Sequence, residues 1–412
     1  MLCHPTKIIR QGAWRIIVDK YLAMALSCFL LTAIFALIYN PFLLFIHGIL
    51  IGLCGGVLGV LSWHHCHDRI GPFLSWNADP RHSISIRWIS QTPCSHKVIL
   101  RKEDQVISGT EIQSSPNTHH IANFHGLTPN TRYYYEIWED ERKKFAGKTY
   151  YFHTAPEPPA PFSFAAVGDI QANDPVSIIQ ARILWQVRRG CPAFLLTMGD
   201  NVHNWQDAGS WRIFFSLIKR LGRSKPIFTT PGNHDKGVPS GELMARQYLL
   251  APNYVWNYSF TYSNALIISL LSWEEEQFPS QSAWFEEQLL TKSPRVDWVI
   301  VFWHIPWWGP PYDINRPNDP WEMRLREQWA PLFDRYNVDL ILAGHKHGYS
   351  RVGNKIITAA MHGVRKYAEK RFAEEKIINK HHHVRIDVAG KKLRVTAISW
   401  TGQIIDSLEL QK

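Results

Sequence analysis

The longest apolar stretch of the chain lies near the N-terminus. Residues 21–63 contain no Asp, Glu, Lys or Arg, and a helix of that length would be roughly twice as long as the ~30 Å hydrocarbon core of a membrane. Asn40–Pro41 lies near the middle of the stretch, where proline breaks or kinks a helix. The pattern therefore predicts a hairpin of two transmembrane helices, with membrane lipids as its partners.

A basic segment, residues 1–20, precedes this stretch. It contains Lys7, Arg10, Arg15 and Lys20 against the single acid Asp19. Positive residues favour the cytoplasmic side of a membrane, and a hairpin returns the chain to that side. We expect the remaining residues to be cytoplasmic; a signal-anchor that places them outside is the alternative.

Short alternating segments, which are typical of strands, occupy residues 75–154. Ile84, Ile86 and Trp88 alternate with polar residues, and Tyr133 and Tyr135 do so after a turn at Pro129. The string LTPNTRYYYEI resembles the fibronectin type III pattern, which implies a small all-β sandwich. A generic β-sandwich is the alternative. The sequence APEPPAP, residues 155–161, predicts a stiff Pro-rich linker.

In residues 162–412, strand patterns alternate with helical ones, which predicts an α/β domain. Five apolar segments in this region each end in polar residues. They are 162–167, 193–198, 227–230, 298–303 and 338–343. An α/β fold gathers its ligands at the carboxyl ends of its strands, so we expect these polar residues to form one site.

The side chains that follow these strands are oxygen and nitrogen donors. They are Asp169, Asp200, Asn233, His304, His345 and His347. Such a set, with a carboxylate able to bridge and no thiolate, suits two divalent metal ions (Mn, Fe or Zn) better than a structural zinc site. A lone Gly-Asp turn or strand-end His is usually structural, so the prediction depends on the whole series.

Composition narrows the class of protein. Of 412 residues, 45% are apolar and 19% charged, which excludes a disordered chain or a coiled coil. The formal net charge of +10 comes without a nucleic-acid recognition motif, so we expect no nucleic-acid partner. The sequence predicts no oligomeric state.

The motifs GDIQ, GDNVH, GNHD, a strand ending in WH, and GHKH resemble those of the calcineurin-like metallophosphoesterase superfamily. With the preceding β-sandwich, they resemble a purple acid phosphatase-type member. The resemblance runs from about residue 75 to the C-terminus. It implies a four-layer αββα sandwich for residues 162–412.

The resemblance also implies roles for the site residues. Asp169 and His347 would hold the first metal, and Asp200 would bridge both metals. Asn233, His304 and His345 would hold the second. His234 would protonate the leaving oxygen as general acid, and Asp235 would orient it.

Two positions depart from the purple acid phosphatase pattern. His203 replaces the tyrosine at the end of GDxxY, which implies a protein that is not purple and favours Mn, Zn or ferrous iron over ferric iron. Gln171 stands where these phosphatases have Gly. Either side chain could be a ligand of the first metal, and His203 is the stronger candidate.

The implied activity is a metal-dependent phosphoesterase that cleaves a phosphate-ester substrate with a metal-activated hydroxide. Phosphomonoesters are slightly favoured over diesters. The alternative is an inactive phosphoesterase-like protein that uses the β-sandwich for binding or adhesion. Trp205, Trp273 and the aromatic loop at 306–312 would either contact a substrate or pack the loops.

Overall fold

The computed structural model describes residues 70–412 except for short internal segments, namely 91–95, 113–118, 140–142, 145–148, 174–177, 236–249, 251, 253–254, 273–274, 310–318 and 362–372. The predicted basic segment and transmembrane hairpin lie outside the described residues. Among the helices that are described, none is both long and apolar enough to cross a membrane. Residues 69–412 form one compact unit.

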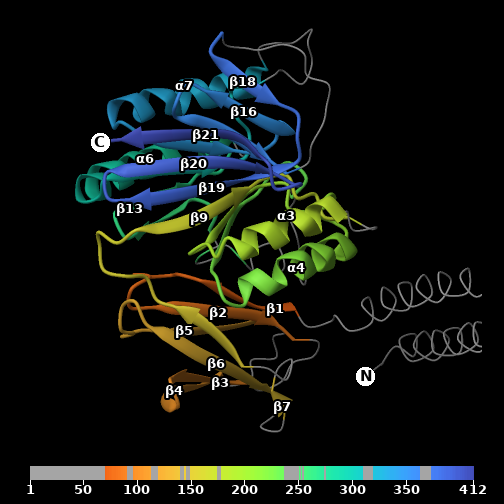
Figure 1. Ribbon diagram of the computed structural model, residues 1–412, viewed down its shortest axis with the longest axis vertical. Coiled ribbons are helices and arrows are strands. Elements are labelled where there is room, and N and C mark those ends of the chain that lie inside the picture. Colours follow the sequence, from red (N-terminus) through yellow and green to blue (C-terminus); the bar gives the residue numbers. More distant parts are fainter. Residues whose placement is uncertain are drawn as a thin grey trace, which may run out of the picture. The chain divides into compact units, whose positions relative to one another are not determined.

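The first part of this unit is a domain of two antiparallel sheets (Figure 1). The three-stranded sheet has the order β1-β2-β5, with β1 at Ile70–Ser75, β2 at Ile84–Ile89 and β5 at His119–Phe124. The other sheet consists of β3 (His96–Lys102), β4 (Gln105–Ile112), β6 (Arg132–Glu139), β7 (Lys143–Lys144) and β8 (Tyr150–His153). Strand β1 thus begins five residues before the expected start of the domain at Ser75.

The aromatic residues singled out in the sequence lie in the core of this domain. Tyr133 and Tyr135 are buried on β6, and the Tyr133 hydroxyl accepts a hydrogen bond from the Thr128 amide, at 2.8 Å. A tyrosine that bonds the backbone just upstream is a feature of immunoglobulin-like sandwiches. Apolar and polar residues alternate along strand β2, yet all of its residues are buried.

The second part of the unit contains two larger sheets. The first has the order β11-β10-β9-β19-β20-β21 and the second β12-β13-β14-β15-β17-β16-β18. The strands of the first sheet are β9 (Phe162–Val167), β10 (Leu195–Met198), β11 (Ile227–Thr230), β19 (His382–Ala389), β20 (Lys392–Ser399) and β21 (Ile404–Gln411). Those of the second are β12 (Tyr258–Tyr262), β13 (Ala265–Ser269), β14 (Trp298–Trp303), β15 (Leu340–Ala343), β16 (Gly348–Val352), β17 (Ile356–Ala360) and β18 (Glu375–Ile378).

Helices cover the outer faces of the two sheets, which gives the order helices, sheet, sheet, helices (Figure 1). Helices α3 (Ile178–Arg189) and α4 (Ala208–Gly222) pack on the first sheet. Helices α6 (Phe278–Lys292) and α7 (Pro320–Arg335) pack on the second. A third apolar cluster, which includes Phe164, Ile267 and Ile386, fills the space between the sheets. Central strands that are buried on both faces read as continuous apolar runs, which explains the five apolar segments of the sequence.

The β domain and the α/β domain share a packed junction. The Trp76 ring lies within 5.3–5.9 Å of the rings of Phe194, Phe228, Phe260 and Tyr262. Aromatic pairs at such distances add to the free energy gained by burial. The residues 155–161 therefore connect two domains that are already held together by an apolar contact.

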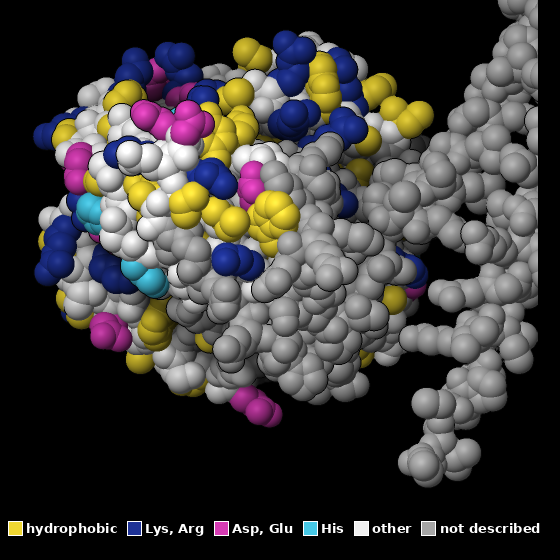
Figure 2. Space-filling view, turned by 90° about the horizontal axis from the view of Figure 1, so that it is seen from below, with side chains coloured by type: hydrophobic (Ala, Val, Ile, Leu, Met, Phe, Trp, Pro, Cys, Tyr) yellow, Lys and Arg dark blue, Asp and Glu magenta, His cyan; other side chains and the backbone are white. Residues whose placement is uncertain are grey.

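Charged side chains are mixed on the surface that is seen from the β-domain end. Figure 2 shows Lys and Arg side chains spread among acidic and hydrophobic ones on the described part of this face. A nucleic-acid surface would need positive charge gathered in a patch or stripe. The described part of this face carries acidic and hydrophobic side chains among the basic ones.

A buried carboxylate joins the edges of the two large sheets. Asp406 on β21 accepts hydrogen bonds from the Tyr349 hydroxyl (2.7 Å), Arg351 Nε (2.6 Å) and Lys376 Nζ (2.6 Å) of β16 and β18. Burial would raise the pKa of Asp406, but these hydrogen bonds outweigh it and lower the pKa to about 2. The ionised form therefore stabilises the folded chain.

Replacing Asp406 with Asn should lower the melting temperature by several degrees at pH 7. Because the folded pKa lies below the ordinary value of 3.8, the stabilisation is complete above about pH 4 and is lost as the pH falls towards 2. The difference in melting temperature between wild type and variant should therefore become smaller as the pH falls from about 4 to 2. Asp387→Asn, which disrupts a more exposed pair with Arg385, is the matched control and should have a much smaller effect. Equal losses in both variants would contradict the prediction.

Candidate dimetal centre

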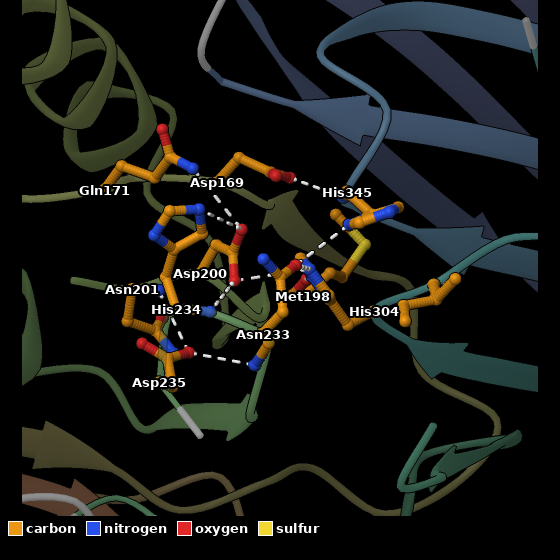
Figure 3. Close-up of polar contacts among 12 residues, drawn as sticks. Asp169, Gln171, Met198, Asp200, Asn201, Asn233, His234, Asp235, His304 and His345 are labelled. Carbon is orange, nitrogen blue, oxygen red and sulfur yellow. Dashed lines mark hydrogen bonds and ion pairs between the residues drawn. The ribbon is translucent and has the colours of Figure 1, made fainter. Parts of the chain in front are cut away.

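The predicted donor residues come together where strands of both large sheets end (Figure 3). Asp169 and Asp200 follow β9 and β10, and Asn233 follows β11 of the same sheet. His304 follows β14 and His345 follows β15 of the second sheet. The site is thus assembled at the carboxyl ends of parallel strands from both sheets.

Two glycines allow the loops to approach this closely. A side chain on Gly199, which has a φ of +77°, would lie 2.5 Å from His304 Nδ1. A side chain on Gly232 would collide with the carboxylate of Asp200. The glycines in the GDN and GNH motifs are therefore required by the packing of the ligands.

Asp200 lies at the centre of the cluster. Its Oδ1 is 3.3 Å from His304 Nε2 and accepts a hydrogen bond from the His234 amide, at 2.9 Å. Asn233 Oδ1 lies 3.1 Å from His304 Nε2 and 3.0 Å from His345 Nδ1. Donor atoms of Asp200, His304 and His345 all lie within 4.8 Å of one another, a spacing that suits one metal ion.

Asp169 and His347 form the neighbouring pair. The completely buried Asp169 accepts a hydrogen bond at Oδ2 from the His345 amide, at 2.8 Å. Its Oδ1 is buried, has no hydrogen-bond partner among the described residues and lies 3.6 Å from His347 Nε2. A buried carboxylate oxygen without a donor is costly, and a second cation between these two atoms would remove that cost. The residues therefore fit a pair of divalent ions.

The backbone of the ligands is held in an uncommon conformation. Asp169, Gln171, Asp200 and His345 have φ values of 53°, 43°, 50° and 66°. Non-glycine residues rarely adopt this left-handed region, and such strain gathers at functional sites.

Charges within the cluster shift its pKa values. Burial would lower the pKa of His304, but the Asp200 carboxylate outweighs it and raises the pKa to about 9. Burial raises the pKa of Asp169 well above its ordinary value, and the nearby Asp200 adds to this. Two carboxylates this close are stabilised by positive charge between them, which a divalent cation supplies.

His234 is half-buried and faces Asp200, with its Nε2 4.0 Å from Asp200 Oδ2. Its Nδ1 lies 2.7 Å from the backbone oxygen of His203. A carbonyl oxygen only accepts, so Nδ1 carries a hydrogen and Nε2 is left to exchange a proton towards the centre.

The orientation of His234 thus involves a backbone carbonyl, and the expectation that Asp235 orients this histidine stays a prediction. The described hydrogen bonds of the Asp235 carboxylate come from the amides of Gly232, Asn201 and Val202 and from the Asn201 side chain. Asp235 thus holds the GDNV and GNHD loops together.

The two positions that depart from the phosphatase pattern differ in their surroundings. The amide nitrogen of Gln171 lies 3.3 Å from Asp200 Oδ2 at the edge of the cluster. The His203 side chain is exposed, and its ring centroid is 5.3 Å from that of His234. Gln171 thus contacts Asp200 directly and His203 lies beside His234, and which of the two would hold the first metal stays a prediction.

The aromatic residues after His304 pack the loop. Trp307 and Trp308 are buried against α7, and Trp308 donates a hydrogen bond to Thr358. Trp205 is partly buried, whereas Trp273 lies outside the described residues. For Trp307 and Trp308, packing is the role that the structure supports.

A buried ion pair beside the ligands was not predicted from the sequence. Lys346, between His345 and His347, lies 2.8 Å from Glu322 of α7, and both side chains are buried. A side chain on Gly309, in the loop after His304, would lie 3.0 Å from Lys346 Cδ. Lys346 therefore contacts α7 and the His304 loop while its neighbours face the metal site. In the sequence, the position of Lys346 between His345 and His347 is the feature that could have indicated this ion pair.

The chain matches two protein families. Residues 162–349 match the calcineurin-like phosphoesterase family, and residues 71–154 match the purple acid phosphatase N-terminal domain. The chain therefore contains a calcineurin-like metallophosphoesterase domain, preceded by a purple acid phosphatase N-terminal domain. The predicted resemblance is confirmed, while the fibronectin type III label stays a prediction.

Similar proteins include an uncharacterised protein of Mycobacterium tuberculosis, 27% identical over 333 residues, which cover 71% of this chain and 59% of that protein. Purple acid phosphatase 21 of Arabidopsis thaliana is 27% identical over 252 residues, which cover 58% of this chain and 54% of that protein. The chain thus matches little more than half the length of these relatives.

A solved purple acid phosphatase from yellow lupin seeds has the same fold, with a TM-score of 0.66 and 15% sequence identity. The superposition covers 84% of this chain and 74% of the lupin chain.

Replacing Lys346 with Met should destabilise the fold by about 3 kcal/mol, because removing one member of a buried ion pair leaves a poorly solvated charge. The affinity for Mn²⁺ should also fall, since His345 and His347 flank the substituted residue. Denaturant unfolding and metal titration measure the two effects. Lys355→Met, on an exposed turn, is the matched control and should change the free energy of unfolding by less than about 0.5 kcal/mol.

The double variant Lys346→Met/Glu322→Leu should recover much of the lost stability, because an apolar pair can replace a buried ion pair. Losses that simply add in the double variant would contradict the coupling of the two residues.

Proposed function

We propose that this chain is a dimetal phosphohydrolase that acts on phosphomonoesters. The position of Asp200 is the observation that carries the proposal. Its Oδ1 faces His304 and its Oδ2 faces Gln171 and His234, so one carboxylate can serve two adjacent cations. Two bound divalent ions would supply an activated water and neutralise the charge of the phosphoryl group.

The protein's own groups supply the other requirements of ester cleavage. His234 lies over Asp200, and its Nε2 is free to donate a proton to the leaving oxygen as the ester bond breaks. The His203 carbonyl holds the imidazole in place throughout the step. The side-chain oxygen of Asn233 lies close to His304 and His345. It would therefore be a ligand of the same metal ion.

The preference for monoesters is supported by the names of the relatives, which include a phosphatase. Two observations disfavour an inactive binding or adhesion protein. Asp169 Oδ1 is buried without a hydrogen-bond partner among the described residues, and several expected metal ligands have positive φ values. Both features cost folding free energy, which a bound cation would offset.

We also propose that residues 21–63 anchor the chain in a membrane as a helical hairpin, on the basis of their charge-free sequence. The full chain, expressed in cells, should stay in the membrane pellet during alkaline carbonate extraction. Release into the supernatant would contradict the anchor.

Asp200→Asn should lower the hydrolysis of an aryl phosphomonoester by the Mn-loaded full chain by at least about 1000-fold, because several kcal/mol of transition-state stabilisation depend on the metals. An aryl phosphodiester assayed in parallel assigns the ester class, and the monoester should be the faster substrate. Asp207→Asn is the matched control, since the described contacts of the Asp207 carboxylate cap α4; its activity should stay within about threefold of wild type. Full activity in Asp200→Asn would refute the two-metal site.

His234→Asn should reduce kcat by about 100-fold or more for an alkyl phosphate, whose leaving group needs a proton. For 4-nitrophenyl phosphate the loss should be much smaller, because a nitrophenolate leaves without protonation. The ratio of kcat for the two substrates is the measurement. A similar loss for both would show that His234 is not the general acid.

A further inference from the structure

A cavity of about 320 Å³ lies between α3 and the first sheet, away from the metal site. Phe164 and Ala165 of the early part of β9 line it, together with Pro192, which precedes β10. Asp169 and Asp200 follow the opposite ends of these strands. The cavity is therefore separate from the predicted catalytic centre, and its volume is at the lower end for a small-molecule site.

The rim of the cavity carries positive charge and an aromatic ring. The guanidinium carbons of Arg182 and Arg189 lie 4.4 and 5.0 Å from the centre of the Trp185 ring, and Trp185 is 40% exposed. Among the described residues, no carboxylate pairs with Arg182 or Arg189, and residues 175–199 contain no Asp or Glu. These guanidinium groups remain available for an anion.

A third basic residue of the lining, Arg385, is already paired with a carboxylate. Arg385 donates to both oxygens of Asp387 and to the Gly190 carbonyl. The Asp387 charge is thereby balanced, so it does not counteract the two guanidinium groups on α3.

A buried histidine, His383, also lines the cavity. The side chain of His383 is 4% exposed, and its Nδ1 has no hydrogen bond to any described residue. Burial lowers the pKa of His383 to about 3, so the ring is neutral and its nitrogen can accept or donate. A neutral imidazole in the wall is compatible with a planar, uncharged ring in the cavity.

From these contacts, we infer that the cavity is a second, non-catalytic site for a small phosphorylated molecule with a planar ring, of the size of a nucleoside monophosphate. The phosphate would be bound by Arg182 and Arg189 through charge-assisted hydrogen bonds. The ring would lie beside Trp185 and reach towards His383 in the cavity wall. The inference is independent of the proposed function, because it needs no turnover.

Isothermal titration calorimetry of the full chain with AMP tests this site, after a chelator has removed metals so that the ester is not hydrolysed. Adenosine and inorganic phosphate are titrated separately, because each is one half of the ligand. AMP should bind more tightly than either. Arg182→Gln and Arg189→Gln should each weaken AMP binding at least about tenfold, the loss expected for one charge-assisted hydrogen bond.

Arg188→Gln is the matched control, because Arg188 is exposed on the same helix but does not line the cavity. It should change the affinity for AMP by less than about twofold, and thermal unfolding checks that all variants are folded. Absence of AMP binding would overturn the inference. So would equal affinity in all variants, or an affinity for phosphate or adenosine alone that matches that of AMP.

Discussion

The close approach of the loop after β11 to the carboxylate of Asp200 is the contact on which the site depends. A side chain at Gly232 would overlap that carboxylate, so glycine is required there. With the loop in place, the His234 amide donates to Asp200 and Asn233 reaches His304 and His345. The Asp235 carboxylate then joins this loop to the one that carries Asp200. Ligands from two sheets are thus brought together by backbone packing.

The ligands also carry conformational strain. Asp169, Asp200 and His345 have positive φ values, and the two carboxylates are buried near each other. Each of these features costs free energy in the folded chain. The apolar clusters on both faces of the sheets offset that cost, which is the usual relation between a rigid scaffold and a strained site.

Much of this arrangement could be predicted from the sequence, because each ligand directly follows a continuous apolar strand. Such strands, together with short glycine motifs, are local signals. The sequence could not reveal contacts between distant segments. The ion pair of Lys346 and Glu322 joins a loop to a helix, and neither residue has a local pattern that indicates a partner. The hydrogen bonds that Asp235 accepts from Asn201 and Val202 also depend on where the loop after β10 folds. The burial of both faces of β2 likewise depends on tertiary packing.

The first strand of the β domain, β1, packs against the α/β domain as well as against its own sheet. Phe73 of β1 packs on Phe215 of α4, and Leu74 forms a bridge to Pro226 before β11. Gly222 lacks a side chain at the point where Phe73 enters. Strand β1 also pairs with β2, so it belongs to the cores of both domains. An exchange of the β domain between relatives would succeed only if the matching surface of α4 were transferred with it. The Pro-rich segment is a boundary in the sequence, but the cooperative unit of folding extends across it.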